Sequence, residues 1–289
     1  MAVLISCGQS LSVERCFVSA YCHVYLSPHL DDVVLSCGGR IYQLTQAGES
    51  VLVVTVFAGS PHLGEGEADT AASRYVAALH QRWETELDAP ALRRKEDEAA
   101  LRLLGADFCH LSYLDCIYRQ HPVTNEFLYL SNEGIFAQVH PSEFALATRI
   151  REELDELVGV PGEVMIYSPL TAGHHVDHQI TAAAALALQA SGHRVAFYED
   201  YSYAETPMAL AAARRWVGGE HWRQELFALR QQDLATKVTA VLQYRSQLST
   251  FFDDDAEVAQ RLRAYAMGPH GEAAESQLGP SERVWHLTK

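Results

Sequence analysis

The sequence predicts an α/β fold: a Rossmann-like, doubly wound, mostly parallel sheet with helices on both faces. Short apolar runs rich in β-branched and aromatic residues alternate with longer amphipathic stretches, as strands and helices do in such folds. His and Asp also gather directly after two of the apolar runs, at 29–32 and at 174–178. Because parallel strands end at the same edge of a sheet, we expect both clusters at the carboxyl edge, where ligands bind.

The first part of the chain is expected to supply three strands. They are the apolar runs 24–27, 51–57 and 108–113. One helix is expected from 31 to about 46, and residues 70–104 are helical with a break at Ala89-Pro90. Residues 115–140 are polar and aromatic, and we expect them to form an irregular loop that covers a substrate.

The rest of the chain continues the alternation. Helices are expected at 141–158, 180–189, 233–248 and 256–266, and strands at 163–168, 194–198, 222–229 and 282–287. The sequence leaves open whether the strand at 222–229 runs antiparallel to the others. We expect residues 1–20 to be a peripheral N-terminal extension and residues 21–289 to form a single domain.

The composition argues against some classes of partner. With 22 Lys and Arg against 37 Asp and Glu, the formal net charge is −15, which disfavours nucleic acid and anionic membranes as partners. No apolar run reaches the roughly 18 residues that cross a bilayer. The six cysteines form no Cys-x-x-Cys pair, so we expect reduced thiols in a cytoplasmic protein.

The cluster at 29–32 combines ligand types that suit zinc. Imidazole and carboxylate both bind this ion, and His29 and Asp32 are three residues apart. If a helix begins near Asp31, the side chains of His29 and Asp32 can both point at one ion. The Asp31 carboxylate would then not bind the ion and would be available as a base. The alternative explanation is that the helix dipole favours an acidic first turn.

The second cluster, residues 174–178 (His-His-Val-Asp-His), favours the metal interpretation. Three histidines and an aspartate within five residues are improbable as core or as plain surface. A catalytic zinc site uses three protein ligands and leaves one position open for water, whereas a structural site is closed by four. A carboxylate at Asp31 that is not needed as a ligand favours the catalytic kind.

Both clusters resemble the signatures of the PIG-L/LmbE-like family of zinc-dependent deacetylases, which act on N-acetylglucosamine-type amides. Residues 28–33 are Pro-His-Leu-Asp-Asp-Val, where the family has Pro-His-Pro-Asp-Asp-Glu. Residues 174–178 match its second signature, His-x-x-Asp-His. With weaker likenesses between and after the two, the resemblance covers residues 23–287.

The resemblance implies a role for each residue of the two clusters. Zinc, or another divalent transition metal in its place, would have three protein ligands. These are His29, Asp32 and His178. Asp31 would be the general base that takes the proton from the zinc-bound water. His175 would stabilise the oxyanion or protonate the leaving amine, with Asp177 holding its tautomer and charge.

The resemblance also implies substrate contacts. Arg93 or Arg94 would contact substrate hydroxyls or phosphate, although either could instead form a solvated salt bridge with a nearby glutamate. Two further substrate-binding candidates are His174 and Asp115, which follows the carboxyl end of a predicted strand.

The chain departs from the family pattern at three positions. Leu30 and Val33 replace the Pro and Glu of the first signature, but neither position would supply a ligand. Gly173 stands where some members have a tyrosine thought to help hold the oxyanion. His174, or a tyrosine from elsewhere such as Tyr201, would have to substitute for it.

We therefore expect a zinc-dependent hydrolase that removes an acyl group, in the first instance acetyl, from the amide nitrogen of an N-acetylglucosamine-type sugar or conjugate. Two alternatives are a zinc amidase for a bulkier amide, such as a thiol conjugate, and a metal-binding protein without catalysis. A phosphoesterase would want two bridged metals and more basic residues. The expected partner is a small molecule, and a homo-oligomer is compatible with the sequence.

Overall fold

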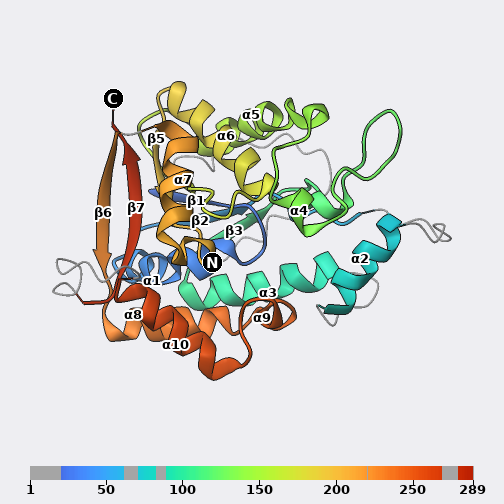
Figure 1. The fold of residues 1–289 in the computed structure, drawn as a ribbon. Coiled ribbons are helices and arrows are strands. Elements are labelled where there is room, and N and C mark those ends of the chain that lie inside the picture. Colours follow the sequence, from blue (N-terminus) through green and yellow to red (C-terminus); the bar gives the residue numbers. More distant parts are fainter. Residues whose placement is uncertain (1–20, 62–70, 83–88, 220, 269–278, 289) are drawn as a thin grey trace.

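One seven-stranded sheet lies between two layers of helices (Figure 1). The computed structural model describes residues 21–61, 71–82, 89–219, 221–268 and 279–288, so the expected extension at 1–20 lies outside the described part. The strands are β1 (His23–Ser27), β2 (Val51–Thr55), β3 (Asp107–His110), β4 (Met165–Pro169), β5 (Arg194–Tyr198), β6 (Trp222–Ala228) and β7 (Ser281–Leu287). They lie in the order β3-β2-β1-β4-β5-β7-β6.

The strand directions confirm the predicted fold class. Neighbours from β3 to β5 are parallel, and β7 runs antiparallel to both β5 and β6. The chain starts in the middle of the sheet at β1, adds β2 and β3 on one side, and then adds β4 and β5 on the other. The order thus reverses between β1 and β4, which is the point where open α/β sheets bind ligands.

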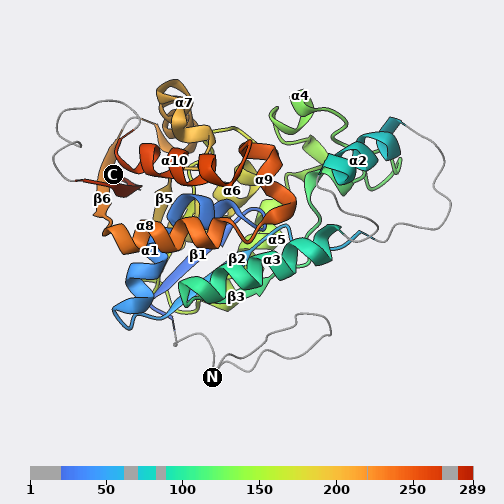
Figure 2. The ribbon, with the colours of Figure 1, turned by 90° about the horizontal axis from the view of Figure 1, so that it is seen from below.

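Helices cover both faces of the sheet, as the sequence predicts. One layer holds α5 (Leu146–Val158), α6 (Val176–Ala190) and α7 (Pro207–Gly218). The other holds α1 (Asp32–Gln46), α3 (Ala89–Leu104), α8 (Gln231–Val241), α9 (Arg245–Phe251) and α10 (Asp255–Ala266), which Figure 2 shows from below. Two further helices, α2 (Ala71–Arg82) and α4 (Asn132–Ile135), lie at the same side of the molecule in both views.

The sheet is buried on both faces because side chains alternate along each strand. Val24 and Leu26 pack in the core under α5 and α6, whereas Tyr25 packs in the core under α1 and α3. The same alternation separates Val54 from Val53 on β2. Burying one large apolar side chain contributes about 1.5–3 kcal/mol, so the two cores together fix the sheet that carries the site.

The segment 115–140 differs from its expected irregular structure. It contains a 3₁₀ turn (Cys116–Tyr118), a bridge between Gln120 and Phe127, and the short helix α4. The turn is capped by Asp115, whose side chain accepts a hydrogen bond from Ile117 N–H at 3.2 Å. Local capping therefore gives order to a stretch that has no apolar periodicity.

Two predicted helices are present, but they begin at other residues than expected. The helix expected from 180 begins at Val176, which places Asp177 and His178 in the first turn of α6. The expected break at Ala89-Pro90 corresponds to the start of α3, where proline is tolerated because its missing N–H is not needed.

Other boundaries are wrong. The strand expected to reach 113 ends at His110. The helix expected at 233–248 is two helices, α8 and α9, because Tyr244 leaves the helical conformation and donates its hydroxyl to Asp97 of α3 at 2.6 Å. Helix α7 was not predicted, although proline at its first position, Pro207, is a start signal. Within the described ranges, no helix is both long and apolar enough to cross a bilayer.

Candidate metal centre

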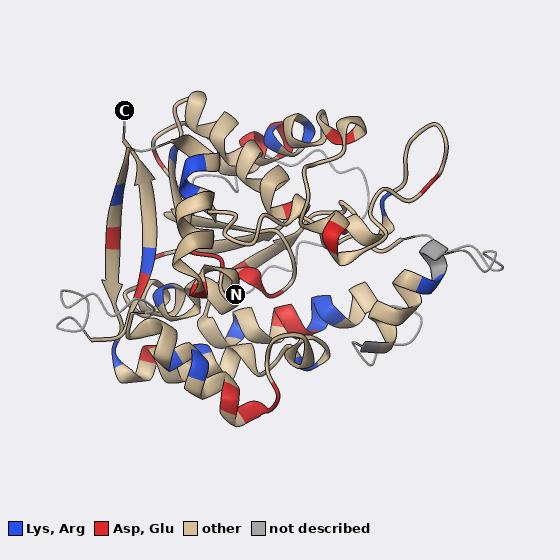
Figure 3. Ribbon diagram, in the orientation of Figure 1, with Lys and Arg blue, Asp and Glu red and all other residues tan. Residues whose placement is uncertain are grey.

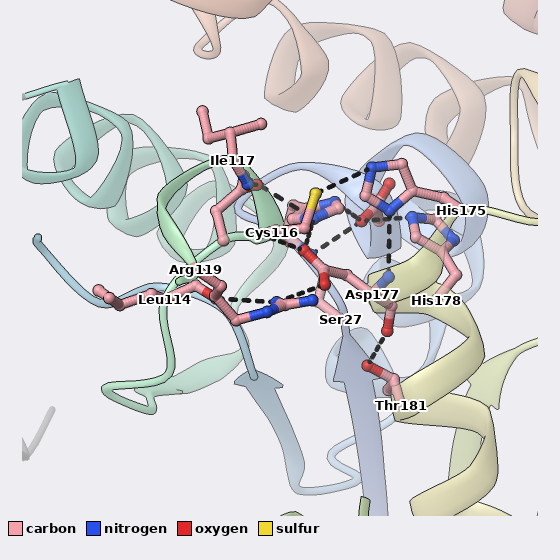
Figure 4. Close-up of polar contacts among 12 residues, drawn as sticks. Ser27, Leu114, Cys116, Ile117, Arg119, His175, Asp177, His178 and Thr181 are labelled. Carbon is pink, nitrogen blue, oxygen red and sulfur yellow. Dashed lines mark hydrogen bonds and ion pairs between the residues drawn. The ribbon is translucent and has the colours of Figure 1, made fainter. Parts of the chain in front are cut away.

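Loops at the carboxyl edge of the sheet bring the two predicted clusters together. Figure 4 shows His175, Asp177 and His178 of the second cluster beside Cys116 and Arg119. His29 and Asp32 follow β1, and residues 174–178 follow β4, the neighbour of β1 in the sheet. Asp115 follows β3, and Asp200 follows β5. Figure 3 shows that acidic and basic residues are spread over the whole ribbon and are not confined to one part of it. The reversal of strand order therefore gathers residues that are far apart in the sequence.

The three expected zinc ligands are in contact. Asp32 Oδ2 lies 3.1 Å from His29 Nδ1 and 3.2 Å from His178 Nε2. In a tetrahedral zinc site with bonds of about 2.0 Å, two ligand atoms lie about 3.3 Å apart. Asp32 and His178 are 6% and 1% exposed. Both contacts of Asp32 are therefore close to the separation of two ligand atoms on one ion.

Each of the two ligand histidines has a second carboxylate on its other ring nitrogen. His29 Nε2 lies 3.0 Å from Asp177 Oδ2, and His178 Nδ1 lies 2.6 Å from Asp200 Oδ1. Carboxylates in this position fix the tautomer and the orientation of a metal-binding imidazole and make it a better ligand. The two rings are thus held with one nitrogen directed at Asp32.

The carboxylates around the His178 ring favour a positive charge on it or next to it. Its buried Nε2 faces Asp32 Oδ2 at 3.2 Å, while Nδ1 is held by Asp200. Burial disfavours the charged ring, but the charge of Asp32 and the hydrogen bond with Asp200 outweigh it and raise the pKa of His178 to about 9. A metal ion can replace a proton at such a nitrogen. The residues present therefore fit a metal.

Asp31 lies next to this cluster without joining it. It is 4% exposed, and Arg93 Nη2 lies 3.8 Å from its Oδ1. Arg93 Nη1 lies 3.8 Å from Asp115 Oδ2, so two of the expected substrate-binding residues reach the site. Burial and the charge of Asp32 raise the pKa of Asp31 to about 6, while Arg93 acts against them. A carboxylate that titrates near neutral pH can take up and release a proton.

Comparison with protein families agrees with this geometry. The family model PIG-L, described as GlcNAc-PI de-N-acetylase, matches residues 24–189, more than half of the chain. The chain belongs to the PIG-L family. The matched range contains both His and Asp clusters, and it confirms the resemblance found in the sequence.

Deacetylases are among the similar proteins. The 2′-N-acetylparomamine deacetylase of Niallia circulans is 28% identical over 248 residues, 81% of this chain and 83% of the relative. A deacetylase of the teicoplanin biosynthesis pathway, solved as a complex with bog, is 29% identical, with a TM-score of 0.68 over 91% of this chain and 96% of that one. The zinc-inhibited form of teicoplanin deacetylase is 28% identical, with a TM-score of 0.69 over the same shares.

In this PIG-L protein, His175 and Asp177 reach the site but do not make the expected contact. The Asp177 carboxylate does not hold His175: its Oδ2 faces His29 and accepts from Cys116 N–H at 3.0 Å. His175 is the N-cap of α6, and its Nδ1 accepts from the backbone N–H of Asp177 at 3.2 Å. Because successive helical residues point to different sides, the Asp177 side chain leaves in another direction. Burial and the neighbouring His29 lower the pKa of His175 well below its usual value, so the ring is neutral.

Two of the expected substrate contacts face elsewhere. Arg94 donates from Nη1 to Ala58 O at 2.7 Å, and so fastens the loop after β2 to α3. His174 adopts a positive φ of 57° and directs its ring toward Gln138 and Trp216. Neither side chain is directed at His29, Asp32 or His178, so the assignment of Arg94 and His174 as substrate-binding residues stays a prediction.

Gly173 makes room for a tyrosine from another loop. A Cβ at position 173 would lie 2.4–2.8 Å from three ring atoms of Tyr203, closer than real contacts allow. The Tyr203 ring meets His178 and Phe136 edge-on, with centroid distances of 5.8 and 5.7 Å. Tyr201, the substitute suggested by the sequence, is instead packed in the core under α1 and α3, so that suggestion is wrong. The tyrosine beside Gly173 is Tyr203.

Arg119 ties the segment 115–140 to the site. It is 8% exposed, its Nη1 lies 2.5 Å from Asp177 Oδ1, and its other nitrogens bind both oxygens of Glu143. Sequence reasoning missed Arg119, Tyr203 and the role of Asp200. The acidic stretch directly after β5 was a signal for Asp200, whereas no sequence pattern marks Arg119.

Proposed function

We propose that this chain is a zinc-dependent deacetylase, which hydrolyses the acetamide of an N-acetylated amino sugar or of a conjugate that carries one. The observation that supports it most directly is the contact of the Asp32 carboxylate with one ring nitrogen of each of His29 and His178, with the separate carboxylate of Asp31 next to them. Similar proteins deacetylate acetylparomamine or take part in teicoplanin biosynthesis. The family description, a de-N-acetylase of GlcNAc-PI, names the same kind of bond.

The ion would be held by His29 Nδ1, Asp32 and His178 Nε2. When bound there, zinc polarises the amide carbonyl and lowers the pKa of a neighbouring water molecule. Zinc is the first choice because two imidazoles and a carboxylate are a common catalytic zinc set. The zinc-inhibited form of the similar teicoplanin deacetylase points to the same metal. Another divalent transition metal would fit the same ligands.

Asp31 would take the proton of the attacking water and pass it to the leaving amine. With a pKa raised to about 6 it is mostly ionised at neutral pH, yet basic enough to accept a proton. Arg93, 3.8 Å away, stabilises the ionised form. The hydroxyl group of the water is transferred to the acetyl carbon, and the other water proton is transferred to the leaving amine. The products are acetate and the free amine, so the reaction needs no other reactant.

His175 would stabilise the negative charge that develops on the carbonyl oxygen. Its Nδ1 accepts the N–H of Asp177, so the proton of the neutral ring is on Nε2, which is then a donor. The ring stands edge-on to those of His29 and His178, with centroid distances of 4.9 and 5.4 Å. A donor at this place typically raises the rate about 100- to 1,000-fold. Of the two roles left open by the sequence, the neutral ring favours oxyanion stabilisation over protonation of the amine.

Tyr203 would be a second donor to the same oxygen. Burial, followed by the charges of Asp32 and Asp31, raises the pKa of its hydroxyl far above the usual value, so the phenol keeps its proton. Beside the reacting group, Arg93 and Asp115 offer one donor and one acceptor for sugar hydroxyls. The segment 115–140, fixed by Arg119, would limit the size of the substrate.

The proposal is tested by measuring release of free amine from a panel of amides. The panel contains 2′-N-acetylparomamine, an N-acetylglucosaminyl glycopeptide, N-acetylglucosamine and a bulkier thiol-conjugate amide. We expect release from at least one acetylated sugar, its loss after treatment with a chelator, and its return with about one equivalent of zinc. If amine is released from the thiol conjugate alone, the substrate is a bulkier amide and not an acetylated sugar. Release that survives removal of all metal would refute the zinc mechanism.

A further inference from the structure

Cys116 brings a thiol to the site that the proposed reaction does not use. It begins the 3₁₀ turn after β3 and is completely buried. In Figure 4 its sulfur points at the ring of His175, and Cys116 Sγ lies 3.8 Å from His175 Nε2. Burial and the charges of Asp177 and Asp115 raise the pKa of the thiol well above its usual value, so it is protonated.

The positions of these side chains are close to those of metal ligands. With zinc–sulfur and zinc–nitrogen bonds of about 2.3 and 2.05 Å, the two ligand atoms of a tetrahedral site lie about 3.6 Å apart. The observed 3.8 Å needs almost no movement. A carboxylate oxygen of Asp177 completes a group whose ligand atoms all lie within 4.8 Å of one another.

The surrounding charge leaves room for a second cation. Five carboxylates lie around the ligand clusters, namely Asp31, Asp32, Asp115, Asp177 and Asp200. Two guanidinium groups, those of Arg93 and Arg119, face them, and Arg119 is also paired with the Glu143 carboxylate. With Glu143, six carboxylates stand against two guanidinium groups, and one divalent ion neutralises two of the four excess negative charges. The remaining charge favours another cation over an anion.

We propose that Cys116, His175 and Asp177 form a second metal site, which takes a thiophilic divalent cation such as cadmium or excess zinc and thereby inhibits the enzyme. Thiolate ligands select such ions. On binding, a bond forms between the metal and the Cys116 sulfur, and the thiol proton leaves to solvent. The ring proton of His175 moves from Nε2 to Nδ1, so that Nε2 can bind the metal.

This rearrangement explains why the site would fill second. Moving the proton to Nδ1 gives up the 3.2 Å hydrogen bond from Asp177 N–H. The ion must also displace the thiol proton and approach the Arg119 guanidinium, which lies 2.5 Å from Asp177. At the cluster of His29, Asp32 and His178 the ion has no thiol proton to displace. Inhibition follows because the bound ion occupies the nitrogen with which His175 would hold the oxyanion, an argument that rests on the proposed function.

Binding can be tested without any catalytic assay. Enzyme loaded with one equivalent of zinc is titrated with cadmium while the ultraviolet sulfur-to-cadmium charge-transfer band is followed. Wild type should develop the band with about one equivalent, with release of one proton. Cys116→Ala and the near-isosteric Cys116→Ser should not. Cys22→Ala, which removes an exposed thiol at the opposite end of β1, should develop it as wild type does.

Inhibition is tested with the same proteins. Excess zinc or cadmium should suppress amine release by wild type and by Cys22→Ala, and Cys116→Ala should need at least about 10-fold more metal for the same loss. A missing band in wild type, a band that survives in Cys116→Ala, or equal inhibition of all variants would overturn the proposal. An enzyme that develops the band but acts on none of the amides would instead count against the proposed function.

Discussion

Replacing Arg93 by glutamine is expected to move the acidic limb of the pH–activity profile to higher pH. Arg93 is 8% exposed, and its Nη2 lies 3.8 Å from Asp31 Oδ1. Its charge favours the ionised form of Asp31 and opposes the burial and the Asp32 charge that raise the pKa to about 6. Without the guanidinium, Asp31 keeps its proton to a higher pH. The base form that the proposed reaction needs therefore appears later as the pH rises.

The size of the shift follows from the distance. Two unit charges 3.8 Å apart interact by about 1 kcal/mol in water and about 4 kcal/mol at the effective dielectric constant of a protein. One pKa unit corresponds to about 1.4 kcal/mol, which limits the shift to between about 0.8 and 3 units. Arg93 also lies 3.8 Å from Asp115, and this second carboxylate reduces the effect of the Arg93 charge on the pKa of Asp31. We therefore expect a shift of about 1 unit.

The assay is kcat/KM for amine release as a function of pH, because this parameter reports groups of the free enzyme. Arg94→Gln is the matched control: it removes the same charge one residue further along α3, where the guanidinium donates to Ala58 O. The limb should move in Arg93→Gln and stay in place in Arg94→Gln. An unmoved limb in a folded, metal-loaded Arg93→Gln, or equal movement in both variants, would refute the assignment of Asp31 as the titrating base.

Three further predictions concern the groups around the ligands. Tyr203→Phe keeps the ring that packs on Gly173 but removes the donor, so kcat should fall about 100-fold with unchanged zinc content; an unchanged kcat would exclude the hydroxyl from the reaction. Asp200→Asn weakens the partner of His178 Nδ1, so the Kd for zinc, measured by competition with a chelator, should rise about 10- to 100-fold; equal affinity would contradict the orienting role. Arg119→Met leaves the buried carboxylates of Asp177 and Glu143 without their shared cation, which should cost about 3–5 kcal/mol of unfolding free energy in denaturant titrations. A cost under about 1 kcal/mol would show that the pair contributes little.

The fold and the meeting of the two His and Asp clusters could be predicted because their signals are local. Alternating apolar runs identified the parallel strands, and His29 and Asp32 follow one of these runs at the start of a helix. His178 likewise follows an apolar run, β4, and lies at the start of a helix. Strand order then brings the two ends together by a general rule of α/β sheets. None of these steps depends on the detailed packing of side chains.

The remaining contacts could not be predicted because they depend on tertiary packing. The direction of the Asp177 carboxylate follows from the true start of α6, four residues before the expected one. Tyr203 reaches the site only because Gly173, on a different loop, has no side chain. Arg119 is one arginine among many in the sequence, and its burial between Asp177 and Glu143 gives it its role.

The most direct test of a metal-dependent hydrolase measures zinc content and amine release in wild type and Asp31→Asn. Because Asp31 is not among the proposed ligands, both proteins should hold about one zinc ion. The rate of Asp31→Asn should be about 100- to 10,000-fold lower, since amide nitrogen cannot take the proton. His178→Ala, which removes a ligand, should lose the zinc. If Asp31→Asn loses its zinc, or keeps both zinc and the full rate, the separation of ligands and base described above is contradicted.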